Sequence, residues 1–73
     1  MQIARLNFNP ARYVQTEAGN VSAITPDECE RILAGCFSRW LEPVAEYIED
    51  KRPDLWPTVD RVMVARGFEP PEP

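Results

Sequence analysis

Acidic residues recur in the second half of the chain at spacings that could bring their carboxylates together for chemistry. Glu42, Glu46, Glu49 and Asp50 follow one another at short steps of one, three or four residues, and Asp54 lies just beyond them. On a helix, steps of three and four residues place side chains on one face. Paired carboxylates catalyse glycoside hydrolysis only where a cleft gives them different environments. Because an exposed helix face offers no cleft, we expect either a solvated stripe or a surface that binds a basic partner.

The residue types needed for nucleophilic catalysis or metal binding are scarce. The chain has no histidine and two cysteines, Cys29 and Cys36. Seven residues along a helix rise about 10 Å, which is too far for a disulfide between them. Two buried thiols on one helix face are the preferred interpretation, and a disulfide between two copies of the chain is the alternative. No base is available to activate a serine or cysteine, so we predict no enzyme activity, no metal and no cofactor.

Trp56 is the aromatic residue whose position is hardest to explain by a core role. It follows Leu55 within a bend from Pro53 to Pro57, where a connection is ordinarily polar. Tryptophan is enriched at the centres of protein interfaces. Two interpretations remain open: Trp56 covers the end of the core, or it contributes to a partner-binding surface with the acidic residues.

Length and charge limit the classes of protein to consider. With 73 residues and a net charge of −4, the chain has room for one compact domain, expected over residues 1–68, and lacks the clustered cations of a generic nucleic-acid-binding surface. Residues 69–73 (Glu-Pro-Pro-Glu-Pro) predict a disordered tail. The N-terminus lacks the apolar run of a signal peptide, so we expect a cytoplasmic protein with no membrane segment. Small size favours a homodimer or docking onto a partner.

The first third of the sequence has the pattern of a small antiparallel sheet. Residues 4–8 alternate apolar and polar side chains until Asn9-Pro10 breaks the alternation. Residues 12–16 are rich in β-branched and aromatic types, and a turn at 18–20 would fold them back onto residues 21–24. These features predict a β-hairpin or a three-stranded meander.

Helical signals dominate the rest. Thr25 to Glu28 (Thr-Pro-Asp-Glu) predicts a capping box at the start of a helix over residues 25–41. Pro43 should stop or kink this helix, although the apolar phase continues to Ile48. A last helix is expected from residues 54–57 to Arg66, closed by Gly67 with Phe68 folding back onto Met63.

The sequence thus predicts an α+β fold in which a small N-terminal antiparallel β-hairpin or meander packs on two to three helices. The apolar residues in phase with one another define the expected core. They are Phe8, Ile24, Ile32, Leu33, Phe37, Trp40, Val44, Ile48, Val59, Val62 and Met63.

The leading functional hypothesis is a non-catalytic module that binds another protein. The expected partner-binding residues are Glu42, Glu46, Glu49, Asp50, Asp54 and Trp56, and a basic, nucleic-acid-binding patch is the expected target. Phage and mobile-element inhibitors of host machinery, anti-CRISPR proteins among them, share this small, acidic, catalytically empty character, although no motif links them to this chain. The alternatives are a small dimeric transcriptional regulator and a structural or virion-assembly component. Direct nucleic-acid binding is disfavoured by the charge.

Overall fold

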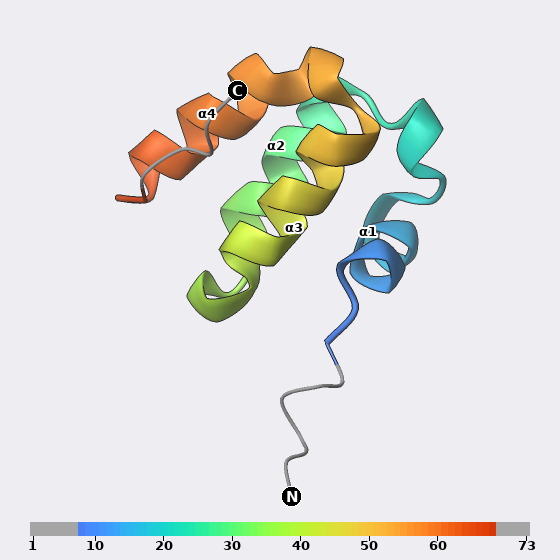
Figure 1. The fold of residues 1–73 in the computed structure, drawn as a ribbon, viewed down its shortest axis with the longest axis horizontal. Coiled ribbons are helices and arrows are strands. Elements are labelled where there is room, and N and C mark those ends of the chain that lie inside the picture. Colours follow the sequence, from blue (N-terminus) through green and yellow to red (C-terminus); the bar gives the residue numbers. More distant parts are fainter. Residues whose placement is uncertain (1–7, 69–73) are drawn as a thin grey trace, which may run out of the picture.

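The chain folds as a bundle of helices in the computed structural model, which describes residues 8–68. In chain order these are α1 (Pro10–Ala18), the 3₁₀ helix η2 (Val21–Ala23), α2 (Pro26–Gly35), α3 (Ser38–Lys51), the 3₁₀ helix η3 (Pro53–Leu55) and α4 (Trp56–Ala65). Figure 1 shows α2 and α3 side by side, with α1 and α4 on opposite sides of them. Helix α2 packs mainly on α4, and α1 packs mainly on α3.

The predicted N-terminal sheet is wrong, because the described part of the chain contains no strand. Residues 12–16 lie inside α1, and residues 21–23 form η2; of the segment 4–8, only Phe8 lies within the described residues. Asn9-Pro10 is a helix start rather than a break. The Asn9 side chain accepts hydrogen bonds from the backbone nitrogens of Ala11 and Arg12, at 3.0 and 3.3 Å, and proline suits the first helical position.

The segment expected as a hairpin turn ends α1 instead. Gly19 has φ +85°, a backbone conformation that other residues rarely adopt. Its N–H donates to the Gln15 carbonyl at 2.8 Å, which closes the last turn of the helix. The same glycine therefore fits either a hairpin or a helix end, and the helix-capping Asn9 decides between them.

The capping box at α2 is confirmed, but the helix is shorter than predicted. The Glu28 N–H donates to the Thr25 hydroxyl at 3.1 Å, and the Thr25 N–H donates to the Glu28 carboxylate at 2.9 Å. The helix ends at Gly35, and α3 begins at Ser38 and continues through Pro43 to Lys51. The break therefore lies at residues 36–37 and not at the proline.

The end of α4 matches its prediction. Phe68 donates its N–H to the Met63 carbonyl at 2.8 Å, and Gly67 donates to the Val64 carbonyl at 3.0 Å with φ +83°. These two bonds define a Schellman motif. The predicted tail at residues 69–73 lies outside the described residues, and the extent of the domain stays a prediction.

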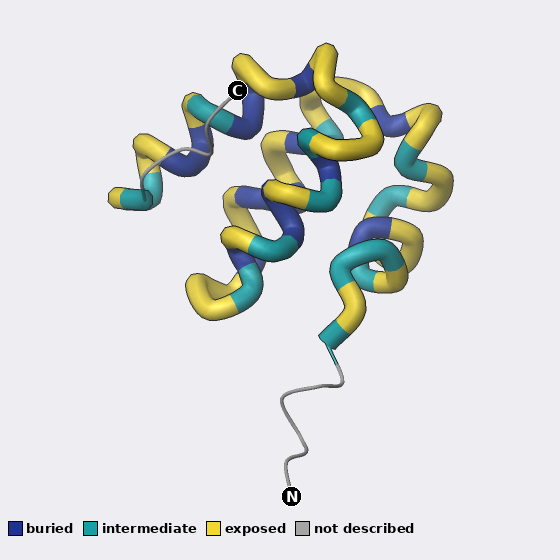
Figure 2. The backbone as a smooth tube through the Cα atoms, viewed as in Figure 1, coloured by how far each residue is buried: buried dark blue, intermediate teal, exposed yellow. Residues whose placement is uncertain are grey.

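The core lies between the facing sides of the helices, where Figure 2 shows the buried residues. Eight of the eleven predicted core residues are buried, and Phe8 and Trp40 are partly buried against them. Phe37 is a wrong prediction, because 59% of its surface is exposed. The buried apolar residues absent from the predicted core list are Val14, Cys29, Cys36, Leu41, Ala45 and Leu55, and the polar Thr58 is buried as well.

Both cysteines are free and buried, as the preferred interpretation expected. Burial raises the pKa of the Cys29 thiol from 9.0 to about 11, since a thiolate would lose its hydration. Burial also raises the pKa of Cys36. At neutral pH both side chains are therefore protonated members of the core.

We expect alkaline pH to destabilise the fold through Cys29. An unfolded thiol loses its proton near pH 9.0, whereas the folded one keeps it to about pH 11, so the unfolded state binds fewer protons in this window. The free energy of unfolding should be unaffected by this group below pH 9 and should fall by up to about 1.4 kcal/mol per pH unit above it. Urea unfolding of the wild type and of Cys29→Ala at pH 8 to 11 measures this, and an equally steep fall in both would refute it.

Candidate functional site

The predicted partner-binding residues lie on α3, on the connecting 3₁₀ helix η3 and at the first position of α4. Glu42, Glu46 and Asp50 are exposed and Glu49 is half-buried, so α3 presents the four carboxylates on one side, away from its buried residues. Glu42, Glu46 and Glu49 make no ion pair within residues 8–68. Asp50 has only a long contact with exposed Lys51, with 3.8 Å between Oδ2 and Nζ.

Asp54 differs from the other acids because its carboxylate is already occupied. Arg52 donates from Nε and Nη2 to the two oxygens of Asp54, both at 2.9 Å, and this hydrogen bonding lowers the pKa of Asp54. Arg52 Nη1 also donates to the carbonyls of Val21 and Ile24, at 3.1 and 3.0 Å. Asp54 therefore orients an arginine that holds η2 against the end of α3, and a structural role explains it better than partner binding.

The fold adds Asp60, a carboxylate that the sequence interpretation did not include. Asp60 is half-buried on α4, and its charge acts on Glu49. Partial burial raises the pKa of Glu49, and the neighbouring charges of Asp60 and Glu46 raise it further. Asp60 makes no ion pair within the described residues. The negative surface therefore spans α3 and α4.

Trp56 lies at the first position of α4 and is 46% exposed. Its neighbour Leu55 is buried and fills the core at this place. Asp60 follows Trp56 by four residues, so the two side chains share one face of α4. We call Glu42, Glu46, Glu49, Trp56 and Asp60 the acidic surface.

The arginines of α4 and its C-cap bind groups outside the acidic surface. Arg61 Nη2 lies 3.1 Å from Glu30 Oε1 on α2, and Arg66 donates to the carbonyls of Leu33 and Cys36, at 2.8 and 2.6 Å. Both arginines therefore serve the packing of α4 on α2. They do not neutralise the acidic surface.

Two further features were sought in the described residues, a cluster of metal ligands and a helix that could cross a membrane. Within residues 8–68, no group of three or more Cys, Asp and Glu side chains is placed to hold a metal. None of the helices in this part of the chain combines the length and the apolar composition that crossing a membrane requires.

The arrangement of charges suits binding better than proton transfer. The four carboxylates of the acidic surface lie on helix faces, where Glu42 and Glu46 are exposed and Glu49 and Asp60 are half-buried. What they provide is a patch of negative potential on α3 and α4, and Trp56 shares one face of α4 with Asp60 of this patch. Comparisons with protein-family models, with curated proteins and with solved structures found no match for this chain.

Proposed function

We propose that this protein is a non-catalytic binding module that inhibits another protein by docking its acidic surface on a basic, nucleic-acid-binding patch. One observation carries the proposal: α3 and α4 together carry four carboxylates without a basic partner among the described residues, and α4 also carries a half-exposed tryptophan. Exposed acids alone are common, but acids grouped with an aromatic residue have the composition of a binding site.

The electrostatics of Glu49 favour a basic partner. Its raised pKa means that ionised Glu49 is disfavoured by its burial and by the charges of Asp60 and Glu46. A lysine or arginine of a partner placed among these carboxylates would relieve the repulsion. Because binding would then favour the ionised carboxylate, affinity should weaken as the pH falls toward the pKa of Glu49.

The acidic surface also has a shape that would let it occupy a partner's binding site for nucleic acid. Glu42 and Glu49 lie seven residues apart on α3, which is about 10 Å of helix rise, and with Glu46 between them they present negative charge in a row. A nucleic-acid backbone presents its phosphates in the same linear manner. Trp56, on the same face of α4 as Asp60, would supply the apolar contact that fixes the position of the partner.

We expect that a partner captured by the wild type is lost when the acidic surface is altered. The purified protein would be immobilised and nuclease-treated bacterial lysate passed over it at physiological salt. The test variant is Glu46→Gln/Glu49→Gln/Trp56→Ala. The control variant, Glu17→Gln/Asp27→Asn/Val64→Ala, also removes two charges and one exposed apolar side chain, but outside the acidic surface.

The proposal predicts one protein complex that the wild type and the control retain and the test variant loses. The captured protein should also bind nucleic acid, and the wild type should compete for that site. Equal capture by the test and control variants would show that the acidic surface is not the binding site. Direct retardation of duplex DNA that weakens steeply with salt would point instead to a regulator, and concentration-dependent higher oligomers to an assembly component.

A further inference from the structure

A second exposed surface lies at the start of α3 and is built from aromatic rings. Phe8 stacks on Trp40 with 4.5 Å between ring centres, and Phe37 lies 5.1 Å from Trp40. Tyr13 approaches both Phe8 and Trp40 at 6.1 Å. Phe37 is 59% exposed, although the sequence gives it the phase of a core residue. We call Phe8, Tyr13, Phe37, Arg39 and Trp40 the aromatic surface.

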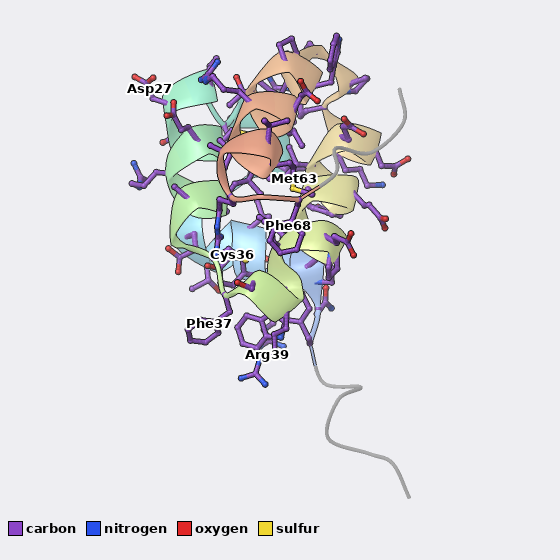
Figure 3. All side chains as sticks on the ribbon, turned by 90° about the vertical axis from the view of Figure 1, so that its left-hand side faces the viewer. Asp27, Cys36, Phe37, Arg39, Met63 and Phe68 are labelled. Atoms are coloured by element: carbon purple, nitrogen blue, oxygen red, sulfur yellow. The ribbon has the colours of Figure 1, made fainter. Side chains whose placement is uncertain are left out.

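Arginine gives this surface a positive charge, in contrast to the acidic surface. The Arg39 guanidinium carbon lies 5.8 Å from the centre of the Phe37 ring and 5.7 Å from that of Trp40. Figure 3 shows Phe37 and Arg39 projecting from one end of the molecule. Within residues 8–68, neither Arg39 nor nearby Arg12 has an ion-pair partner. Arg12 lines a hollow of about 250 Å³ with Phe8, Tyr13, Trp40 and their neighbours.

The chemistry of the aromatic surface suits a proline-rich segment that carries acids. Proline rings pack on aromatic side chains in grooves that recognise polyproline helices, and carboxylates form strong charge-assisted hydrogen bonds with guanidinium groups. The chain itself contains such a segment, Glu69 to Pro73 (Glu-Pro-Pro-Glu-Pro).

The side chain of Arg66, two residues before the end of the described structure, reaches the chain on both sides of Phe37. Arg66, at the end of α4, donates to the carbonyls of Leu33 and Cys36, and its Nη2 lies 3.4 Å from the Ser38 hydroxyl. Phe37 stands between Cys36 and Ser38 in the chain. The hydrogen bond from Phe68 to Met63 then fixes the point from which residue 69 departs.

We propose that residues 69–73 bind the aromatic surface of the same molecule, with the prolines on the aromatic rings and Glu69 or Glu72 facing Arg39. Five residues in a polyproline helix span about 15 Å, and the segment begins three residues after Arg66, whose side chain reaches the Cys36 carbonyl. A short tether gives a local concentration on the order of millimolar, so a weak contact is enough. This inference does not depend on the proposed function, which uses other residues.

Charge disfavours the two other occupants that the chain could supply. Residues 1–7 include Arg5, which would add a third cation beside Arg12 and Arg39. Two copies of the molecule that paired through this surface would bring Arg39 against its own counterpart. Only residues 69–73 supply carboxylates without a cation.

NMR of the full-length chain tests the proposal through the proline ring protons. Protons held over aromatic rings shift upfield, and we expect this for Pro70 or Pro71 in the wild type. Arg39→Glu should return these shifts to random-coil values, and so should Glu69→Lys/Glu72→Lys. Combining the three substitutions restores opposite charges and should restore the upfield shifts. Arg31→Glu, a charge reversal on an exposed face of α2, is the matched control and should change nothing.

Three results would overturn the intramolecular contact. The first is random-coil proline shifts in the wild type. The second is upfield shifts that Arg39→Glu leaves in place. The third is upfield shifts that disappear on dilution, because these would place the segment on a second copy of the chain.

Discussion

Replacing Leu33 with alanine is expected to lower the free energy of unfolding by about 3 to 5 kcal/mol. Leu33 is completely buried on α2, the helix that packs most closely on α4. The substitution removes apolar contact area and leaves a cavity that short helices fixed at both ends cannot close. A chain of 73 residues has a total stability of about 4 to 11 kcal/mol, so this one change removes a large part of it.

Chemical denaturation monitored by circular dichroism measures the loss at Leu33, and thermal unfolding should show a midpoint lower by at least about 12 °C. Val64→Ala is the matched control, because it also truncates an apolar side chain on a packed helix, but at a position that is 58% exposed. We expect it to change the stability by no more than about 0.5 kcal/mol. Similar losses in the two variants would mean that α2 and α4 do not pack as described.

Replacing Arg66 with methionine is expected to cost about 2 to 3 kcal/mol. Its guanidinium donates to the carbonyls of Leu33 and Cys36, at 2.8 and 2.6 Å, where α2 has ended and its last carbonyls lack helical partners. Methionine keeps the aliphatic stem and removes the donors. The cost is therefore that of leaving two partly buried acceptors without protein hydrogen bonds.

Arg61→Met is the appropriate comparison for Arg66, because Arg61 lies on the same helix and carries the same charge. Its ion pair with Glu30 is exposed on both sides, and such pairs contribute between 0 and about 1 kcal/mol. Urea unfolding of both variants should therefore show a much larger loss for Arg66→Met. Equal losses would indicate that Arg66 acts through net charge and not through the two carbonyls.

Arg66 also explains why the sequence misplaced the break between α2 and α3. The apolar phase runs through residues 29–41 without interruption, and Pro43 is the obvious local signal for a helix end. The chain turns at Cys36 and Phe37 instead, where the carbonyls of Leu33 and Cys36 are satisfied by an arginine 30 residues or more away. A cap supplied from so far along the chain leaves no local pattern to read.

The N-terminal error has a local cause. Asn-Pro is as typical of a turn as of a helix start, and a five-residue window at 12–16 is too short to separate a strand period from a helical one. By contrast, the capping box at Thr25 and the Gly67–Phe68 motif each combine two residue types at a fixed offset. Both were predictable, because two independent requirements rarely coincide by chance.

The acidic surface was predictable in part for a similar reason. The spacing of Glu42, Glu46 and Glu49 determines a shared helix face whatever the tertiary structure. Asp60 joins them only through the packing of α4 on α3, which no spacing within one helix reveals. Its position four residues after Trp56 was the one available signal in the sequence. The pairing of Asp54 with Arg52 became evident only from the fold.

Helix α1 buries fewer residues than the other α-helices, so the stability against local unfolding differs along the chain. Val14 is the only buried residue of this helix, whereas α2, α3 and α4 each bury three or four. Local unfolding begins where the least apolar surface is lost, so we expect α1 to be the first unit to detach and its amides to be the first to exchange with solvent. Its departure removes Phe8 and Tyr13 from Trp40 and Tyr13 from the Cys36 thiol. We therefore expect Cys36 to react with thiol reagents through this partial opening, and Cys29 to stay protected until the whole bundle unfolds.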